Sequence, residues 1–280
     1  MNSIIGSSLS MGSFLPLSRM AEAEKSASAS YANAKPFPHI VFDNFFDQNL
    51  LEQVLSEFPK PGEINWQRFD NAQEIKLASS SESSFGPTTR LFLYHLNSIT
   101  FLEFLGRVTG ITNLISDPCF DGGGLHQIRR GGKLSVHADF NKHPRFNLDR
   151  RLNVLIYLNK DWREEYGGHL ELWNRDITRC EAKILPVFNR FAVFGTTDFT
   201  FHGHPDPLQC PENVTRKSLA LYYFSNGRPA EEISGGSHST IFVPRTNEEF
   251  KLNFKQRMAN VARDLLPPIV TRNLKKYLFR

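Results

Sequence analysis

Residues 150–159 read RRLNVLIYLN, and this stretch indicates the fold class. Successive side chains of a strand point to opposite faces, so every second residue shares a side. One side is apolar throughout and holds Leu152, Val154, Ile156 and Leu158. The other side is mixed and holds Arg151, Asn153, Leu155 and Tyr157. The alternation predicts a strand with one face in an apolar core and polar groups on the opposite face.

Similar short runs, rich in Val, Ile, Phe and Tyr, continue from about residue 124 to 243. Turn residues separate them and no helical pattern intervenes, which favours a sandwich or jelly roll over a parallel α/β sheet. Apolar residues at helical spacing predict helices over 47–58, with Asp47 as N-cap, and over 91–109. Thr246 and Glu249 form a capping box ahead of a closing helix. We therefore expect a mainly β fold with flanking helices.

Composition divides the chain into three segments. Residues 1–35 are rich in Ser and Ala, and we expect a flexible leader. The first 20 residues contain Arg19 and no acid, which leaves organellar targeting open as an alternative. Residues 36–226 are predicted to form the main domain, and residues 227–280 a C-terminal helical extension.

The overall composition is that of a globular protein. Of the 280 residues 40% are hydrophobic and 22% charged, and the mean hydropathy is −0.36. No apolar run reaches the 18 residues of a membrane span, so we expect no transmembrane segment. Three cysteines without a CxxC pair favour a reducing compartment, and we expect a cytoplasmic protein. Residues 251–280 hold eight Lys and Arg against one acid, but no nucleic-acid motif accompanies them, so no nucleic-acid partner is expected. The sequence does not indicate an oligomeric state.

Candidate metal ligands occur in the stretch GGKLSVHADFN, residues 131–141. His137 and Asp139 are two residues apart, so a strand would direct both to one face. His202 and His204 follow the predicted strand 191–201. Two histidines and one carboxylate are the facial triad of non-haem Fe(II) oxygenases, and zinc chemistry is the alternative for the same ligands. The pattern alone leaves His202 and His204 open as the third ligand.

Groups that could bind an anion lie on two other predicted strands. TRKSLALYYF, residues 215–224, places Arg216 and Ser218 on one strand face. A guanidinium presents a planar fork to a carboxylate, and a nearby hydroxyl adds a donor. Tyr157, on the polar face of residues 150–159, is predicted to reach the same pocket.

The order of these motifs carries a resemblance. HAD, RRLNVLIYLN, GGHLELW, FHGHP and TRKS follow one another between residues 137 and 218. In this order they resemble the Fe(II)/2-oxoglutarate-dependent dioxygenases, and within them the prolyl 4-hydroxylase-like group. PFPHIVFDNFF, residues 36–46, is similar to the opening of that group. The resemblance covers about residues 36–226 and implies a double-stranded β-helix (jelly roll) core.

The resemblance also implies roles for single residues. His137, Asp139 and His202 match the iron ligands, with His202 preferred to His204 because it ends its strand. Arg216, Ser218 and Tyr157 match groups that bind the distal carboxylate of 2-oxoglutarate. One departure is Ile128, which stands where many relatives have a tyrosine nine residues before the first ligand.

The implied function is hydroxylation of an unactivated carbon by Fe(II), 2-oxoglutarate and dioxygen, with release of succinate and CO2. The implied partner is a small-molecule or peptide substrate. Demethylation and desaturation are related outcomes of the same chemistry. Two alternatives from other classes are a non-catalytic jelly-roll binding module and a zinc hydrolase that uses the same ligands. The sequence does not identify the substrate.

Overall fold

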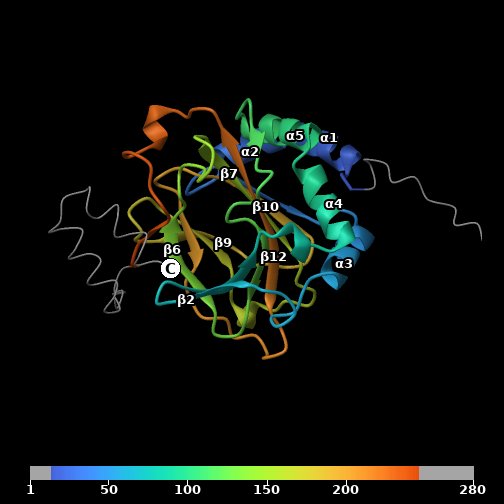
Figure 1. Ribbon diagram of the computed structural model, residues 1–280. Coiled ribbons are helices and arrows are strands. Elements are labelled where there is room, and N and C mark those ends of the chain that lie inside the picture. Colours follow the sequence, from blue (N-terminus) through green and yellow to red (C-terminus); the bar gives the residue numbers. More distant parts are fainter. Residues whose placement is uncertain (1–13, 246–280) are drawn as a thin grey trace, which may run out of the picture.

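The computed structural model describes residues 14–245, and a single large sheet forms most of its core (Figure 1). Five helices precede or interrupt the first strands. They are α1 (Leu17–Glu24), α2 (Ala27–Asn33), α3 (Gln48–Ser56), α4 (Pro87–Leu96) and α5 (Ile99–Thr109). Three short 3-10 turns are η2 (Glu82–Ser84), η3 (Glu164–Tyr166) and η4 (Ala230–Glu232).

The described strands number thirteen and pair antiparallel throughout. The early ones are β1 (His39–Asp43), β2 (Gln67–Asp70), β3 (Glu74–Ser79), β4 (Ile115–Ser116), β5 (Gly124–Ile128), β6 (Lys133–Ala138) and β7 (Asp149–Tyr157). The later ones are β8 (Leu170–Trp173), β9 (Cys180–Ile184), β10 (Arg190–Gly195), β11 (Phe201–His204), β12 (Arg216–Ser225) and β13 (Ile241–Phe242). Their order is β1-β10-β7-β12-β5-β3-β6-β11-β8-β9, with β2 on β3, β4 on β12 and β13 on β6. The predicted β region is therefore confirmed.

The sheet is rolled rather than flat. Phe194 of β10, near one end of the strand order, lines the same cavity as Leu170 of β8, near the other end. Strands from the two ends of the order can share a cavity only if the sheet curls over it. This curvature creates the interior in which the candidate site lies.

Strand β7 divides the core as its alternation predicts. Leu152, Val154 and Ile156 pack in the larger apolar cluster, which also contains the buried residues of all five helices. Leu155 and Tyr157 lie on the other face, in a smaller cluster inside the rolled sheet. Figure 1 shows the helices gathered along one side of the sheet. One face of β7 thus anchors the helical layer, and the other faces the interior.

The predicted helix over 91–109 is in fact two helices. It is interrupted at Asn97 and Ser98, between α4 and α5. The hydroxyl of Ser98 donates to the carbonyl of His95 at 2.6 Å, and the amide of Asn97 donates to the carbonyl of Asp117 at 3.0 Å. Such side-chain bonds compete with the continuation of a helix.

The predicted N-cap of α3 is confirmed, because the Asp47 carboxylate accepts a hydrogen bond from the Leu50 N–H at 2.9 Å.

The prediction of a flexible leader over residues 1–35 is wrong for its described part, which begins at residue 14. Helices α1 and α2 bury Met20, Ala27 and Tyr31, each at 3% exposure, in the large core cluster. The Ser- and Ala-rich composition concealed these few well-spaced apolar contacts. The remaining residues of the predicted leader, 1–13, lie outside the described residues.

The boundary predicted at residue 226 is also too early. The segment after it contains η4 and β13 rather than an α-helix, and β13 pairs with β6 through Ile241–Ala138 and Phe242–His137. Backbone pairing beside a candidate ligand makes this segment part of the main domain.

The closing helix predicted after Thr246 lies outside the described residues. Within residues 14–245, no helix is long and apolar enough to cross a membrane.

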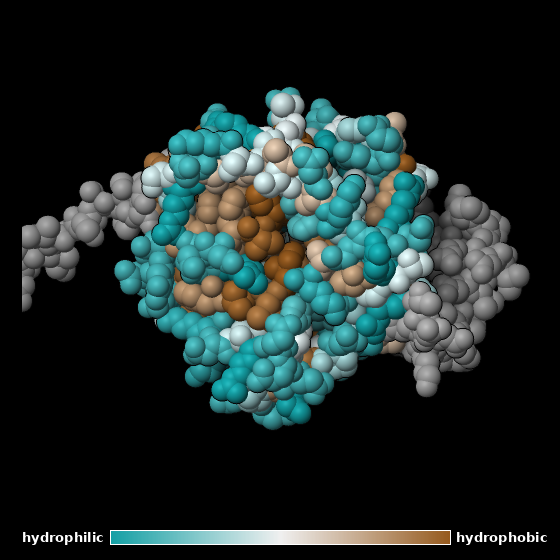
Figure 2. Space-filling model, turned by 180° about the vertical axis from the view of Figure 1, so that it is seen from behind, coloured by the Kyte–Doolittle hydropathy of each residue, from teal (hydrophilic) through white to brown (hydrophobic). Residues whose placement is uncertain are grey.

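The surface seen from behind is hydrophilic over most of its area (Figure 2). Hydrophobic residues gather there in one hollow, bordered by polar groups. Polar cover of this kind is typical of a domain whose apolar side chains are mostly used in its own core.

One partly buried contact joins α3 and α4. The Glu57 carboxylate, just after α3, accepts from the N–H groups of Thr88 and Thr89 at 3.0 and 2.8 Å and from the Thr89 hydroxyl at 2.7 Å. It therefore caps α4, whose own N-cap residue, Gly86, has no side chain to do so. Burial alone would raise the pKa of Glu57, but these hydrogen bonds hold it below its ordinary value.

We predict that Glu57→Ala lowers the free energy of unfolding by about 1–2 kcal/mol, the usual value of a lost helix cap. Because the folded pKa is lowered, this stabilisation is complete above the ordinary pKa of about 4.3 and is lost as the pH falls further. Urea denaturation at pH 7 and at pH 3 measures both effects. Glu103→Ala, at an exposed ion pair with Arg107, is the control and should cost much less. Equal losses for the two variants would contradict the capping role.

Candidate active site

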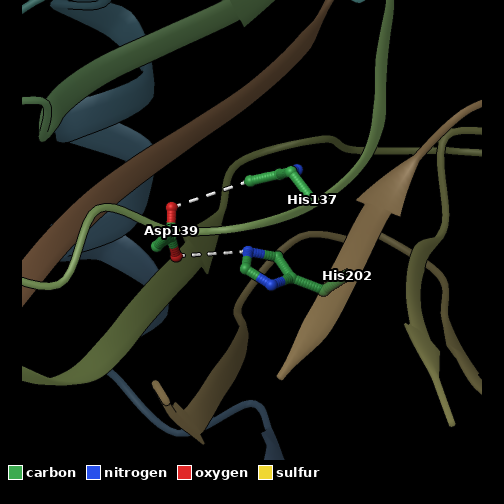
Figure 3. Close-up of side chains that lie close together, drawn as sticks. All are labelled: His137, Asp139 and His202. Atoms are coloured by element: carbon green, nitrogen blue, oxygen red, sulfur yellow. Dashed lines mark ion pairs between the residues drawn. The ribbon is translucent and has the colours of Figure 1, made fainter. Parts of the chain in front are cut away.

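Three side chains from β6, its end and β11 meet inside the rolled sheet (Figure 3). The register pairs His202 directly with His137, and Asp139 follows the last residue of β6. The Nε2 atoms of His137 and His202 lie 3.6 and 3.4 Å from the two carboxylate oxygens of Asp139. One ligand atom from each residue lies within 4.8 Å of the other two. The three side chains can therefore hold one metal ion.

The tautomers of both imidazoles suit a metal. Nδ1 of His137 is 2.9 Å from the Ser135 carbonyl, and Nδ1 of His202 is 3.1 Å from the Thr200 carbonyl. A carbonyl only accepts, so each Nδ1 must carry a proton, and in the neutral ring Nε2 keeps a free lone pair. Backbone carbonyls commonly orient metal-binding histidines in this way. Burial, together with His137, lowers the pKa of His202 to about 4, so its ring is neutral at pH 7.

The carboxylate of Asp139 is held by two neighbours. The Asn153 amide donates to Oδ2 at 2.8 Å, and Nη2 of Arg150 lies 3.1 Å from the same oxygen. Burial alone would raise the pKa of Asp139, but Arg150 and the two imidazoles hold it well below its ordinary value. Asp139 is thus ionised in the absence of a metal.

Arg150 is itself fixed in place. Its side chain is 1% exposed, and its guanidinium carbon lies 3.5 Å from the ring centre of Tyr222 and 4.3 Å from that of Phe140. Two of its nitrogens also donate to Asn153 Oδ1, at 3.0 and 2.6 Å. Stacking and hydrogen bonds leave this cation little freedom, so Arg150 and Asn153 are positioning residues for Asp139.

The three side chains line a cavity of about 210 Å³, and Arg216 and Ser218 line the same cavity. Arg216 is 5% exposed, and its Nε donates to the Gly168 carbonyl at 2.8 Å. Among residues 14–245 no carboxylate forms an ion pair with it. Burial lowers its pKa, opposed by Tyr157, yet an arginine stays protonated at any physiological pH. A buried cation without an acidic partner is well placed to bind an anion.

Tyr157 takes a different place from the one predicted. It is fully buried and does not line the cavity; its hydroxyl is 3.5 Å from Nη2 of Arg216, and its ring lies under the guanidinium. Burial raises the pKa of Tyr157, and Arg216 opposes the shift. The Tyr157 side chain therefore contacts the Arg216 guanidinium without lining the cavity itself.

The sequence of residues 123–224 matches the 2OG-Fe(II) oxygenase superfamily. The chain contains a 2OG-Fe(II) oxygenase domain. This confirms the predicted enzyme class, with Fe(II), 2-oxoglutarate and dioxygen as its cofactors and co-substrates. The alternatives of a binding module and a zinc hydrolase are not favoured.

Two solved structures share the fold of this oxygenase domain. A prolyl-4-hydroxylase from Pseudomonas putida superposes with a TM-score of 0.52 and 14% identity, over 72% of this chain and 100% of that one. A prolyl hydroxylase from Trichoplax adhaerens, in complex with a peptide fragment of the hypoxia inducible factor oxygen degradation domain, gives 0.52 and 18%, over 75% and 92%. They confirm the predicted double-stranded β-helix.

His204 lies in the wall of the oxygenase cavity but outside the metal-binding group. It is 4% exposed, and neither ring nitrogen has a hydrogen-bond partner among residues 14–245. Leaving a buried polar group without a partner costs about 1–3 kcal/mol, so this side chain calls for an explanation. The geometry groups His202, and not His204, with His137 and Asp139.

A second group of possible ligands consists of Asp117, Asp121 and His143. Here Nδ1 of His143 accepts from the N–H groups of Arg145 and Phe146, at 3.1 and 3.2 Å. In the neutral ring Nε2 therefore carries the proton, and it faces Asp117 Oδ1 at 3.2 Å. The His143 ring therefore has no lone pair left for a cation, and only the two carboxylates of this group could act as ligands.

Sequence reasoning missed Arg150, Asn153 and Phe242 as parts of the site. Asn153 stands on the polar face of the quoted stretch RRLNVLIYLN, which was a usable signal. Arg150 has the parity of the apolar face, and the register shift between Leu152 and Arg150 in the pairing with β12 could not be read from the sequence. Phe242 packs its ring 5.6 Å from that of His137 and lies beyond the predicted domain boundary. No local motif marks it, because its place depends on the pairing of β13 with β6.

Gly203 is required where β11 passes β6. A Cβ at this position would lie 2.7 Å from the Leu134 carbonyl oxygen and 2.9 Å from that of Ser135. We predict that Gly203→Ala separates His202 from His137, destabilises the fold by about 1–3 kcal/mol and weakens Fe(II) binding. Thermal unfolding and iron content measure these effects. Gly62→Ala, where a Cβ meets nothing within 4 Å, is the control; a fully stable, iron-loaded G203A protein would contradict the argument.

We also predict that Asn153→Ala weakens Fe(II) binding by roughly tenfold or more, because the Asp139 carboxylate loses its 2.8 Å donor. Anaerobic Fe(II) titration measures the affinity. Asn159→Ala is not a suitable control, since Asn159 joins three backbone segments. Asn174→Ala, in an exposed turn, is suitable and should leave the affinity unchanged. Unaltered binding in N153A would show that Arg150 alone is sufficient.

Proposed function

We propose that His137, Asp139 and His202 bind the Fe(II) ion and that Arg216, with Ser218, binds the distal carboxylate of 2-oxoglutarate. We further propose that the enzyme hydroxylates an unactivated carbon of a small molecule or a peptidyl residue, with release of succinate and CO2. The proposal rests on one observation: a single cavity is lined both by three side chains that can hold a metal ion and by Arg216, a buried cation without an acidic partner among residues 14–245.

The chain's own residues supply position and charge for this reaction. The iron, when bound, supplies the oxidising chemistry. In the neutral ring each of the two imidazoles offers an Nε2 lone pair, and Asp139 offers a carboxylate that is ionised beforehand. Tyr157 and the Gly168 carbonyl hold the Arg216 fork, so its orientation is set before any anion arrives. In the proposed arrangement Tyr157 does not contact the co-substrate but orients Arg216, which binds it.

The position of Arg216 favours an oxygenase over a zinc hydrolase with the same ligands. A hydrolase that needs only the metal and water gives no role to a second cation buried in the metal cavity. Burying an unpaired guanidinium is costly, and a dicarboxylate co-substrate offsets that cost by pairing with it. The same cost weighs against a binding module without a co-substrate.

The substrate class is proposed more broadly than the co-substrate. The Trichoplax protein is seen with a peptide, and its likeness to this chain extends to the fold alone. The cavity beside Asp139 is lined by Arg150, Phe140 and Tyr222, which offer polar and aromatic contacts that suit a small molecule or a peptide side chain.

The proposed location of the protein is the cytoplasm. The three cysteines, Cys119, Cys180 and Cys210, are all unpaired, which supports this proposal.

The test is anaerobic titration of the protein with Fe(II) and 2-oxoglutarate, followed by the visible charge-transfer absorbance of the chelate. We predict a band for the wild type, little or none for His137→Ala and Asp139→Ala, and a demand for at least tenfold more 2-oxoglutarate in Arg216→Ala. Succinate release with candidate small molecules and peptides then reports turnover.

The control is His95→Ala, because His95 lies on α4, away from the cavity, and bonds the Leu91 carbonyl. It should give the wild-type band. A wild type without a band at millimolar Fe(II) and 2-oxoglutarate would refute the proposed function. A wild-type band that persists in H137A would refute the assignment of that ligand alone.

A further inference from the structure

His204 is a buried side chain with unused hydrogen-bonding capacity. Neither Nδ1 nor Nε2 has a partner among residues 14–245, although the residue is only 4% exposed. The other histidines of this interior use theirs: His137 and His202 each bond a backbone carbonyl, and His126 bonds that of Gly122 at 3.0 Å. Nearly all buried polar groups in native proteins have a partner, so a missing ligand is the natural explanation here.

The place of His204 in β11 directs it away from the metal ligands. The register pairs His202 with His137 but His204 with Leu134, and a bulge lies between the two pairs. Its ring nitrogens are not among the atoms that converge on a metal. His204 and the unpaired guanidinium of Arg216 line the same cavity.

The surroundings point to an anion as the missing partner. Arg216 and Ser218 line the cavity with His204, and both can donate hydrogen bonds. Lys76 is also close, but its ammonium already pairs with Glu74 at 3.0 Å. The cavity wall next to Arg216 is Ile128, which pairs with it across β5 and β12 and offers no donor. A further donor, beyond Arg216 and Ser218 of β12, can then come from another strand, and His204 on β11 can supply it.

We propose that His204 is a co-substrate-binding residue, whose ring N–H donates a hydrogen bond to the distal carboxylate of 2-oxoglutarate beside Arg216. The inference rests on the proposed function, since it assumes that 2-oxoglutarate occupies this cavity. A carboxylate has about four acceptor positions, so a guanidinium fork, a hydroxyl and an imidazole can bind it together. This contact would add both affinity and selectivity for a five-carbon dicarboxylate.

The first experiment compares His204→Ala with the wild type in two anaerobic titrations. Fe(II) affinity, measured calorimetrically without co-substrate, should stay within twofold. The 2-oxoglutarate dissociation constant, from the charge-transfer band, should rise roughly tenfold, as expected for one hydrogen bond to a charged group. A variant that loses iron would overturn the proposal and make His204 a metal ligand. A variant with unchanged 2-oxoglutarate affinity would overturn it as well.

The second experiment asks which end of the co-substrate is contacted. 2-Oxobutyrate keeps the keto-acid end and lacks the distal carboxylate. If His204 binds that carboxylate, His204→Ala weakens 2-oxoglutarate but leaves the much weaker binding of 2-oxobutyrate unchanged. An equal loss for both compounds would place the contact at the keto-acid end and overturn the assignment.

Conservative variants and a matched control complete the test. His204→Asn and His204→Gln each keep an N–H donor, near the positions of Nδ1 and Nε2 respectively, and one of them should recover most of the affinity. If neither does, while both fold and bind iron, the hydrogen-bond role is wrong. His126→Asn is the control in the same cavity, since His126 already bonds Gly122, and its 2-oxoglutarate affinity should change less than twofold. A wild type without a band refutes the proposed function, whereas a normal band with an indifferent H204A refutes only this inference.

Discussion

The antiparallel pairing of β6 with β11 is the constraint on which the site depends. It places His202 directly opposite His137, with ring centres 4.4 Å apart, and leaves Asp139 at the end of β6 facing both. Because side chains alternate along a strand, a shift of one residue would turn one imidazole out of the cavity. The close approach at Gly203 holds this register, because only hydrogen fits between β11 and the carbonyls of β6. The backbone geometry of this strand pair therefore fixes how the three candidate ligands lie relative to one another.

The same backbone also sets the protonation of the ligands. Ser135 and Thr200 each stand two residues before a histidine and direct a carbonyl to its Nδ1. The contrast with His143 is instructive, because there two backbone N–H groups face Nδ1 and reverse the tautomer. Both groups bring a histidine and carboxylates within reach of one another, yet only one leaves Nε2 lone pairs free. Proximity of ligand atoms is therefore a weaker criterion than the hydrogen bond on the opposite side of the ring.

Much of the fold and of the candidate site could be predicted, because short sequence patterns determine these parts of the structure. The alternation of residues 150–159 gives the two faces of β7, and the spacing of His137 and Asp139 gives a shared face. What could not be predicted depends on contacts between distant segments. The burial of Tyr31 in the core, the pairing of β13 beside His137 and the place of Tyr157 behind Arg216 all arise from tertiary packing. The choice between His202 and His204 belongs to the same class, since the bulge that separates their surroundings is a property of the β6–β11 pair.

The charges of the cavity explain why its two buried arginines differ. Three cations line the cavity. Arg150 is paired with Asp139 and Lys76 with Glu74, so each pair is close to neutral, whereas Arg216 has no acidic partner among residues 14–245. In the proposed assignment Fe(II) adds two positive charges to this cavity, and 2-oxoglutarate brings two negative ones. Metal binding alone therefore raises the positive potential around Arg216, and the dianion restores the earlier balance. In the same assignment, the unpaired guanidinium costs stability when the cavity holds no anion, but it makes the co-substrate bind more strongly once the metal is present. Because Arg150 pairs with Asp139 and lies against the rings of Phe140 and Tyr222, its charge stays with the Asp139 carboxylate and does not compete for the dianion.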